Sequence, residues 1–211
     1  MQPVLEIFAA DDFALWPVGE HESYGYLVLN GELTPAEVGT AVMRIADCNA
    51  VEAEEEGEGP CATDPLGAFL HGLLTSPRPL AAGGFRVTDN TTAAVYVEPG
   101  CCNGLETWRD WLEMLDGAGS AHFGHDPSSV AERVGDVVRL TLDAHGTDGG
   151  PVIELSVDHV RELAAHVQQD MRDFLRLAGT WAEQHLPAHA AATTAALART
   201  LDLTPTPCRA S

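Results

Sequence analysis

The chain has 211 residues, 45% of them apolar, which suits one folded domain. A chain of this size can bury a sufficient apolar core, so it needs neither a metal nor disulfides merely to fold. Its 32 acidic residues against 11 basic ones give a formal net charge of −21, which argues against nucleic acid or an anionic membrane as a partner. Each basic residue is an arginine, so lysine chemistry such as a Schiff base or a P-loop lysine is excluded.

The cysteine content and the hydropathy pattern indicate a cytoplasmic protein. The five cysteines are an odd number and do not resemble a disulfide framework. No basic segment precedes an apolar run at Met1, and no stretch reaches the roughly 18 apolar residues of a membrane span. The sequence therefore predicts a cytoplasmic location without membrane association.

The first fifty residues predict two strands followed by a helix. The strands are expected at Pro3–Phe8 and Glu22–Asn30, which are rich in apolar and aromatic residues. Thr34 is a typical N-cap, Pro35 a typical first helical residue, and Glu37 completes a capping box. Apolar residues then recur at helical spacing and predict one buried face, formed by Val38, Ala41, Val42, Ile45 and Cys48.

An acidic segment follows this helix. The run EAEEEGEGP at Glu52–Pro60 is too charged to pack, so a solvated, mobile loop is predicted over about residues 50–62. A second short helix is predicted next, with Asp64 as its cap and Pro65 at its first position, and it should end before Pro77.

The middle of the chain predicts two hairpins. Gly84–Asp89 and Thr92–Glu98 flank the turn Asn90-Thr91, and Asp136–Asp143 and Val152–Val157 flank a glycine-rich loop. Hairpins imply antiparallel pairing, so the predicted class is α+β. We expect an antiparallel sheet built from these hairpins, packed against a long C-terminal helix and shorter helices, with a two-layer sandwich as the alternative.

The C-terminal part, residues 156–203, is predicted to be helical. Ser156 caps a long amphipathic segment that Pro187 ends, and an alanine-rich helix follows at Ala188–Leu201. Residues 204–211 are predicted to be a loose tail. Residues 1–203 are therefore expected to form a single domain.

The segment EPGCCNGLETWRDW at Glu98–Trp111 contains the most unusual local feature. Asn103 is predicted to cap a helix, which places Cys101 and Cys102 at the helix N-terminus, where the helix dipole lowers the pKa of a thiol. Such a pair could act as a nucleophile, a redox switch or soft metal ligands, and a purely structural role is the alternative. Adjacent side chains usually point in different directions, which would let one thiol be buried while the other is exposed.

A second candidate segment, HFGHDP, contains His122, His125 and Asp126. Cysteine, histidine and aspartate are all zinc ligands, so Cys101 and Cys102 could join these residues in one site. The spacing lacks the repeated CxxC or HExxH of specific metal motifs, and His-Asp-Pro is also typical of an ordinary turn. The expectation is no cofactor, with zinc as the ion of the alternative hypothesis.

Three segments of the chain resemble a group of uncharacterised proteins from high-GC bacteria. They are CCNGLETWRDW at Cys101–Trp111, FGHDP at Phe123–Pro127 and GDVVRLTLD at Gly135–Asp143. The similarity covers roughly Gly84 to Leu201. No activity is assigned to that group, so the resemblance implies no function and no site residues. In general character the chain also resembles the immunity proteins that neutralise bacterial toxins, which is an analogy only.

The distribution of charge supports a first functional hypothesis. Residues 1–60 contain thirteen acidic residues and one arginine, Arg44, and such a field attracts a basic partner. We therefore expect an interaction module of immunity or inhibitory type that binds a basic protein, although acidity for solubility alone is the simpler interpretation. Its contact residues would be Asp11, Asp12, Glu52, Glu54, Glu55, Glu56 and Glu58.

Two other functions stay open in the sequence. One is a metal- or thiol-dependent protein that uses the cysteine and histidine residues named above. The other is an enzyme acting on a small molecule, but the chain contains no GxSxG elbow, GxGxxG loop, Walker loop or HExxH, and no residue is predicted to be catalytic. A homo-oligomer is compatible with all three functions.

Overall fold

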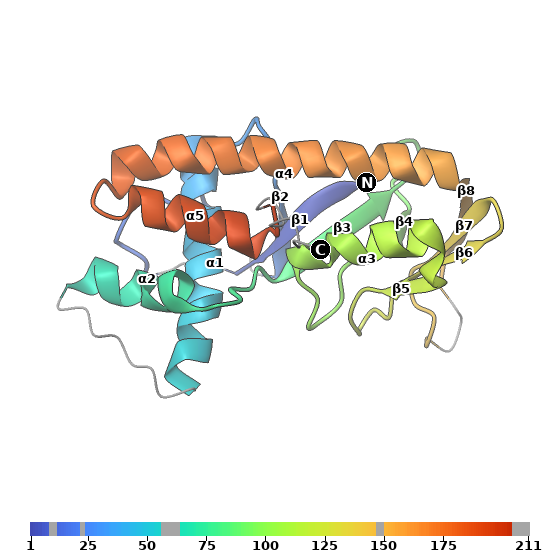
Figure 1. Cartoon of the computed structure of the whole chain (residues 1–211), viewed down its shortest axis with the longest axis horizontal. Coiled ribbons are helices and arrows are strands. Elements are labelled where there is room, and N and C mark those ends of the chain that lie inside the picture. The colour runs from blue at the N-terminus through green and yellow to red at the C-terminus, as the bar shows by residue number, and fades with distance from the viewer. Residues whose placement is uncertain (9–11, 22–23, 56–63, 147–149, 204–211) are drawn as a thin grey trace, which may run out of the picture.

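The computed structural model describes residues 1–8, 12–21, 24–55, 64–146 and 150–203. Within these ranges the backbone forms two four-stranded antiparallel sheets and five α-helices (Figure 1). The predicted α+β class is therefore confirmed, including the antiparallel pairing and the long C-terminal helix.

The first sheet has the strand order β2-β1-β3-β4. The hairpin of β3 and β4 was predicted and is confirmed, with Val87 opposite Val97. The pairing of β1 with both β2 and β3 joins segments that are distant in sequence. The strands are β1 (Gln2–Ile7), β2 (Gly25–Val28), β3 (Gly83–Thr88) and β4 (Val95–Val97).

The second sheet is a meander with the order β5-β6-β7-β8. Its predicted hairpin of β7 and β8 is confirmed, but β5 and β6 were not predicted. Both are short and lack a clear alternating pattern, and they are stabilised by pairing, β5 with β6 and β6 with β7. The strands are β5 (Ser120–His122), β6 (Val130–Val134), β7 (Val137–Thr141) and β8 (Val152–Ser156).

The predicted helix starts at Thr34 and Asp64 are confirmed. In α1 (Pro35–Glu55), the Thr34 N–H donates to Glu37 Oε2 at 2.8 Å and the Glu37 N–H donates to Thr34 Oγ1 at 3.3 Å, which is a capping box. In α2 (Pro65–Thr75), Asp64 Oδ1 accepts from the Gly67 N–H at 2.8 Å. Local side-chain chemistry was sufficient to predict these starts.

The prediction of a loop from about residue 50 is wrong in its first part. Helix α1 continues to Glu55, so the first acidic residues of the run at Glu52 lie in its last turn. Extending an existing helix by one residue costs little, and glutamate is a good helix former. The rest of the predicted loop, from residue 56, lies outside the described residues.

Helix α4 (Val157–His185) spans the long axis of the molecule (Figure 1). As predicted, it begins after Ser156, whose Oγ accepts from the His159 N–H at 3.2 Å. It contacts α1 and α5 (Ala190–Thr200) toward one end and β7 and β8 at the other. Except for Ala164, the residues of its buried stripe belong to one apolar cluster that also includes residues of both sheets. The stripe includes Val160, Ala164, Val167, Met171, Phe174, Ala178 and Trp181.

The helix predicted after Asn103 is divided into three short pieces. They are the 3-10 helix η1 (Leu105–Thr107), α3 (Trp108–Glu113) and the π-helical turn η2 (Met114–Ala118). Asn103 is not the N-cap. Its side chain is buried and its Nδ2 donates to the Gly83 carbonyl at 2.7 Å. The amide therefore ties the chain to β3, and the helical segment begins one residue later than predicted, at Leu105.

Candidate functional site

The chain that follows β4 runs antiparallel to the loop that follows β5. The Gly100 N–H donates to the Phe123 carbonyl at 2.8 Å. The Cys101 N–H donates to the His125 carbonyl at 2.7 Å, and the His125 N–H donates back to the Cys101 carbonyl at 3.3 Å, which makes an isolated β-bridge. This bridge brings together the two segments that contain the candidate ligands.

Two glycines allow this close approach. A Cβ on Gly100 would lie 2.4 Å from the His125 carbonyl oxygen, and a Cβ on Gly124 would lie 2.6 Å from the Cys101 carbonyl oxygen. Gly124 also has φ of +90°, which side chains with a Cβ rarely adopt. Sequence reasoning missed both residues, although a glycine next to each candidate ligand segment was the signal that could have indicated them.

The loops that follow β4 and β5 pack on buried aromatic side chains. The ring of Phe123 stacks on Trp111 with centroids 4.5 Å apart, and Trp111 in turn lies 6.2 Å from Phe85 of β3. The hydroxyl of Ser129 lies 2.8 Å from the carbonyls of both Glu98 and Leu142, so it links the end of β4 to the end of β7. The site therefore lies where the two sheets meet.

The thiols of Cys101 and Cys102 and the imidazole of His125 form the dithiol–imidazole cluster. The two Sγ atoms are 3.5 Å apart, and one ligand atom from each of the three residues lies within 4.8 Å of the other two. All three residues are exposed. Cys102 has φ of +65°, a conformation that non-glycine residues seldom adopt and that is often found at functional sites.

This geometry corrects two predictions about the cysteines. They do not lie at a helix N-terminus, because the first helical residue is Leu105 and that turn is a three-residue 3-10 helix. Neither thiol is buried, and the two side chains lie next to each other instead of pointing apart. The perturbation of these thiols therefore comes from one another and from the histidine.

Hydrogen bonds within the cluster make its three groups unequal. Hydrogen bonds from the Cys101 thiol and then from His125 lower the pKa of Cys102. The same hydrogen bond to Cys102 raises the pKa of Cys101, and hydrogen bonds with Cys102 and Asp126 raise the pKa of His125. Of the two thiols of the cluster, Cys102 is therefore the one that ionises at lower pH.

The other two predicted ligands lie at the margin of the cluster. Asp126 Oδ2 is 3.2 Å from His125 Nδ1, so this carboxylate contacts the imidazole and does not belong to the group of mutually close ligand atoms. The imidazole of His122 contacts Ser120 Oγ, with its Nε2 3.4 Å away, and also lies outside that group. Of the five predicted ligands, the structure brings together three.

The residues predicted to bind a basic partner are only partly described. Asp12 is exposed. Glu52, Glu54 and Glu55 lie in the last turn of α1, where only the backbone is described, and Asp11, Glu56 and Glu58 lie outside the described residues. The interaction with a basic protein stays a prediction.

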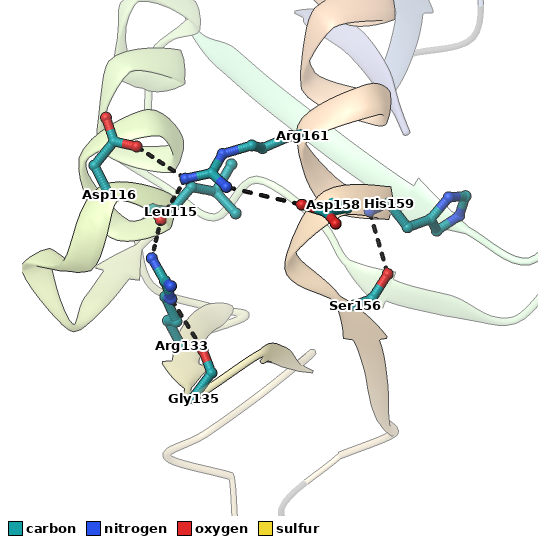
Figure 2. A network of polar contacts seen from close by, with 8 residues as sticks. All are labelled: Leu115, Asp116, Arg133, Gly135, Ser156, Asp158, His159 and Arg161. Carbon is teal, nitrogen blue, oxygen red and sulfur yellow. Dashed lines mark hydrogen bonds and ion pairs between the residues drawn. The ribbon is translucent and has the colours of Figure 1, made fainter.

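A second polar cluster, the arginine clamp, lies at the end of η2 (Figure 2). The Leu115 carbonyl accepts from Arg133 of β6 and, at 3.0 Å, from Nη2 of Arg161 of α4. Arg161 also contacts Asp116 Oδ1 at 3.0 Å and Asp158 Oδ1 at 3.9 Å. Carbonyls at a helix end lack helical partners, and here two cations supply them. The clamp therefore holds η2 against α4 and β6.

The fold and the site together define an α+β protein with a dithiol–imidazole cluster on its surface. Comparison with protein-family models, with curated proteins and with solved structures finds no significant match. Among the helices that the structure describes, none has both the length and the apolar character needed to cross a membrane.

Proposed function

We propose that the protein binds a soft metal ion, with zinc as the first candidate, through Cys101, Cys102 and His125. The observation that supports this function is the mutual proximity of two thiols and an imidazole on the surface, within 4.8 Å. Thiolate sulfur and imidazole nitrogen are the ligands that zinc and other soft ions prefer. The backbone bridge between Cys101 and His125 holds them together without a bound ion.

The distance between the sulfurs fits this proposal. Tetrahedral coordination with zinc–sulfur bonds of roughly 2.3 Å separates two thiolates by about 3.8 Å. The two Sγ atoms are 3.5 Å apart, so a small change in side-chain torsion reaches that value. Binding would require little rearrangement of the backbone.

Three protein ligands at an exposed position leave one coordination site open. Closed, four-ligand sites are typical of structural zinc, whereas an open position is available to water or to an exchanging ligand. Asp126 supports the same arrangement, because histidines that bind metals usually hold a carboxylate with their second ring nitrogen. The site therefore suits an ion that is exchanged or that acts on a bound molecule.

The test is a titration of the reduced, metal-free protein with cobalt(II), followed by competition with zinc. The triple variant Cys48→Ser, Cys61→Ser, Cys208→Ser retains only the two cysteines of the cluster and serves as the parent. We expect one equivalent of cobalt with thiolate-to-cobalt absorption. Replacing either remaining cysteine by serine, or His125 by alanine, should weaken binding by more than about 100-fold, since loss of a ligand exceeds the roughly 10–100-fold cost of second-shell changes.

The matched control is His122→Ala, which removes a histidine of the same segment that lies outside the cluster. We expect it to bind cobalt as the parent does. A parent protein without thiolate-to-cobalt absorption, or with absorption that survives loss of both cysteines, would contradict the proposal.

A further inference from the structure

The two sulfurs that would hold the metal are also positioned to react with each other. They are 3.5 Å apart, both residues are exposed, and no core packing has to be disrupted for either thiol to rotate. A disulfide requires a sulfur–sulfur distance of roughly 2.05 Å, so the pair must close by about 1.5 Å. Side-chain rotation with local adjustment of the backbone can supply such a movement.

We infer that Cys101 and Cys102 form a redox pair, which exchanges with small disulfides and releases the bound metal when it is oxidised. The release rests on the proposed metal-binding function. Formation of the disulfide does not, because it needs only the two thiols.

Oxidation of the cysteine pair by a small disulfide proceeds by two successive thiol–disulfide exchange steps. One thiolate of the pair attacks a sulfur of a small disulfide, forms a mixed disulfide and releases the first small thiolate. The second protein thiol then attacks the protein sulfur of the mixed disulfide, closes the Cys101–Cys102 bond and releases the second small thiolate. The two protein protons end on the two small thiols, and two electrons pass from the protein to the small disulfide.

The adjacency of the two residues favours a reversible reaction. Consecutive Cα atoms are roughly 3.8 Å apart across a trans peptide, whereas disulfides usually join Cα atoms about 4.4–6.8 Å apart. A bond between neighbours is therefore strained and is reduced more readily than an ordinary structural disulfide. The oxidised pair provides no thiolate ligand, so oxidation and metal binding exclude each other.

The charge of the protein indicates which small disulfides react best. The net charge of −21 repels anionic disulfides such as oxidised glutathione, and the exposed carboxylate of Asp126 lies next to the cluster. Cationic disulfides are therefore the expected substrate class, and cystamine is the appropriate probe.

The experiment treats the metal-free triple variant described above with cystamine and measures its mass. We expect the loss of two hydrogens and no adduct. After Cys101→Ser or Cys102→Ser, the remaining thiol has no partner, so each protein should retain one cysteamine adduct. With zinc-loaded protein, a chromophoric chelator should detect one zinc released per disulfide formed, and reduction should restore binding.

Two cysteamine adducts on the parent protein, or one that persists, would overturn the redox pair. A disulfide that forms while zinc stays bound would overturn the release. Because the mass measurement uses metal-free protein, it remains decisive even if the cobalt titration fails. Cobalt binding without disulfide formation would leave the proposed function standing and remove this inference alone.

Discussion

The arginine clamp and the dithiol–imidazole cluster are two polar clusters that differ in how their groups are satisfied. In the clamp, the Leu115 carbonyl has two guanidinium donors, and Arg161 contacts two carboxylates as well (Figure 2). In the cluster, the thiols contact mainly each other and His125, and all of these groups are open to solvent. A polar cluster whose hydrogen-bonding groups all have protein partners contributes to stability. A cluster whose groups still face solvent is available to bind a ligand.

The two clusters also differ in how they are positioned. The clamp depends on long arginine side chains that reach from β6 and α4 to η2. The cluster depends on backbone hydrogen bonds between loops that glycines allow to lie close together. Changes to the backbone should therefore affect the cluster most, and changes to side chains should affect the clamp.

Among changes that leave the three ligands in place, the largest effect is expected for Gly124→Ala. The new Cβ would lie 2.6 Å from the Cys101 carbonyl oxygen at φ of +90°, so the loops must separate. We expect cobalt affinity to fall by more than about 10-fold and stability by roughly 1–3 kcal/mol. Gly119→Ala is the matched control, because its φ is +93° but its Cβ would meet nothing within 4 Å. It should lose stability and keep its affinity, and equal losses of affinity would contradict the role of the close approach.

A smaller effect is expected for Arg161→Ala, measured by urea unfolding. The substitution removes one of the two donors to the Leu115 carbonyl, but the side chain is 45% exposed, which limits the loss to about 1 kcal/mol. Cobalt affinity should not change. Arg172→Ala on the solvent side of α4 is the control and should be close to neutral. An Arg161 variant with weaker cobalt binding and unchanged stability would contradict the assignment of a stabilising role to the clamp and of metal binding to the dithiol–imidazole cluster.

The smallest effect is expected in the pH dependence of alkylation. Because hydrogen bonds lower the pKa of Cys102, its thiolate persists at lower pH than that of an ordinary thiol, and it should react with iodoacetamide first as pH rises. Cys101, with a raised pKa, should react last. His125→Ala removes one of these hydrogen bonds and should move the Cys102 profile to higher pH. Peptide mapping measures both thiols, and identical profiles would contradict the assignment.

Local signals in the sequence were enough for most of the fold. The helix starts at Thr34, Asp64 and Ser156 depend on a side chain and the backbone N–H three residues later, so they could be predicted from neighbours alone. The two predicted hairpins likewise have their turn residues between the strands. The strands β5 and β6 were missed because their formation depends on pairing with neighbouring strands of the second sheet, which their own sequences do not indicate.

The candidate site shows the limit of that reasoning. The sequence by itself determined that two adjacent thiols and two nearby histidines were available as ligands. Only the tertiary structure decided that His125, and not His122, joins them, because the bridge between Cys101 and His125 selects one register of the two loops. It also decided that Asn103 binds β3 instead of capping a helix. Caps and turns depend on interactions between neighbouring residues, so the sequence shows them directly. The approach of two loops that are distant in sequence depends on the packing of the sheets and helices that carry them.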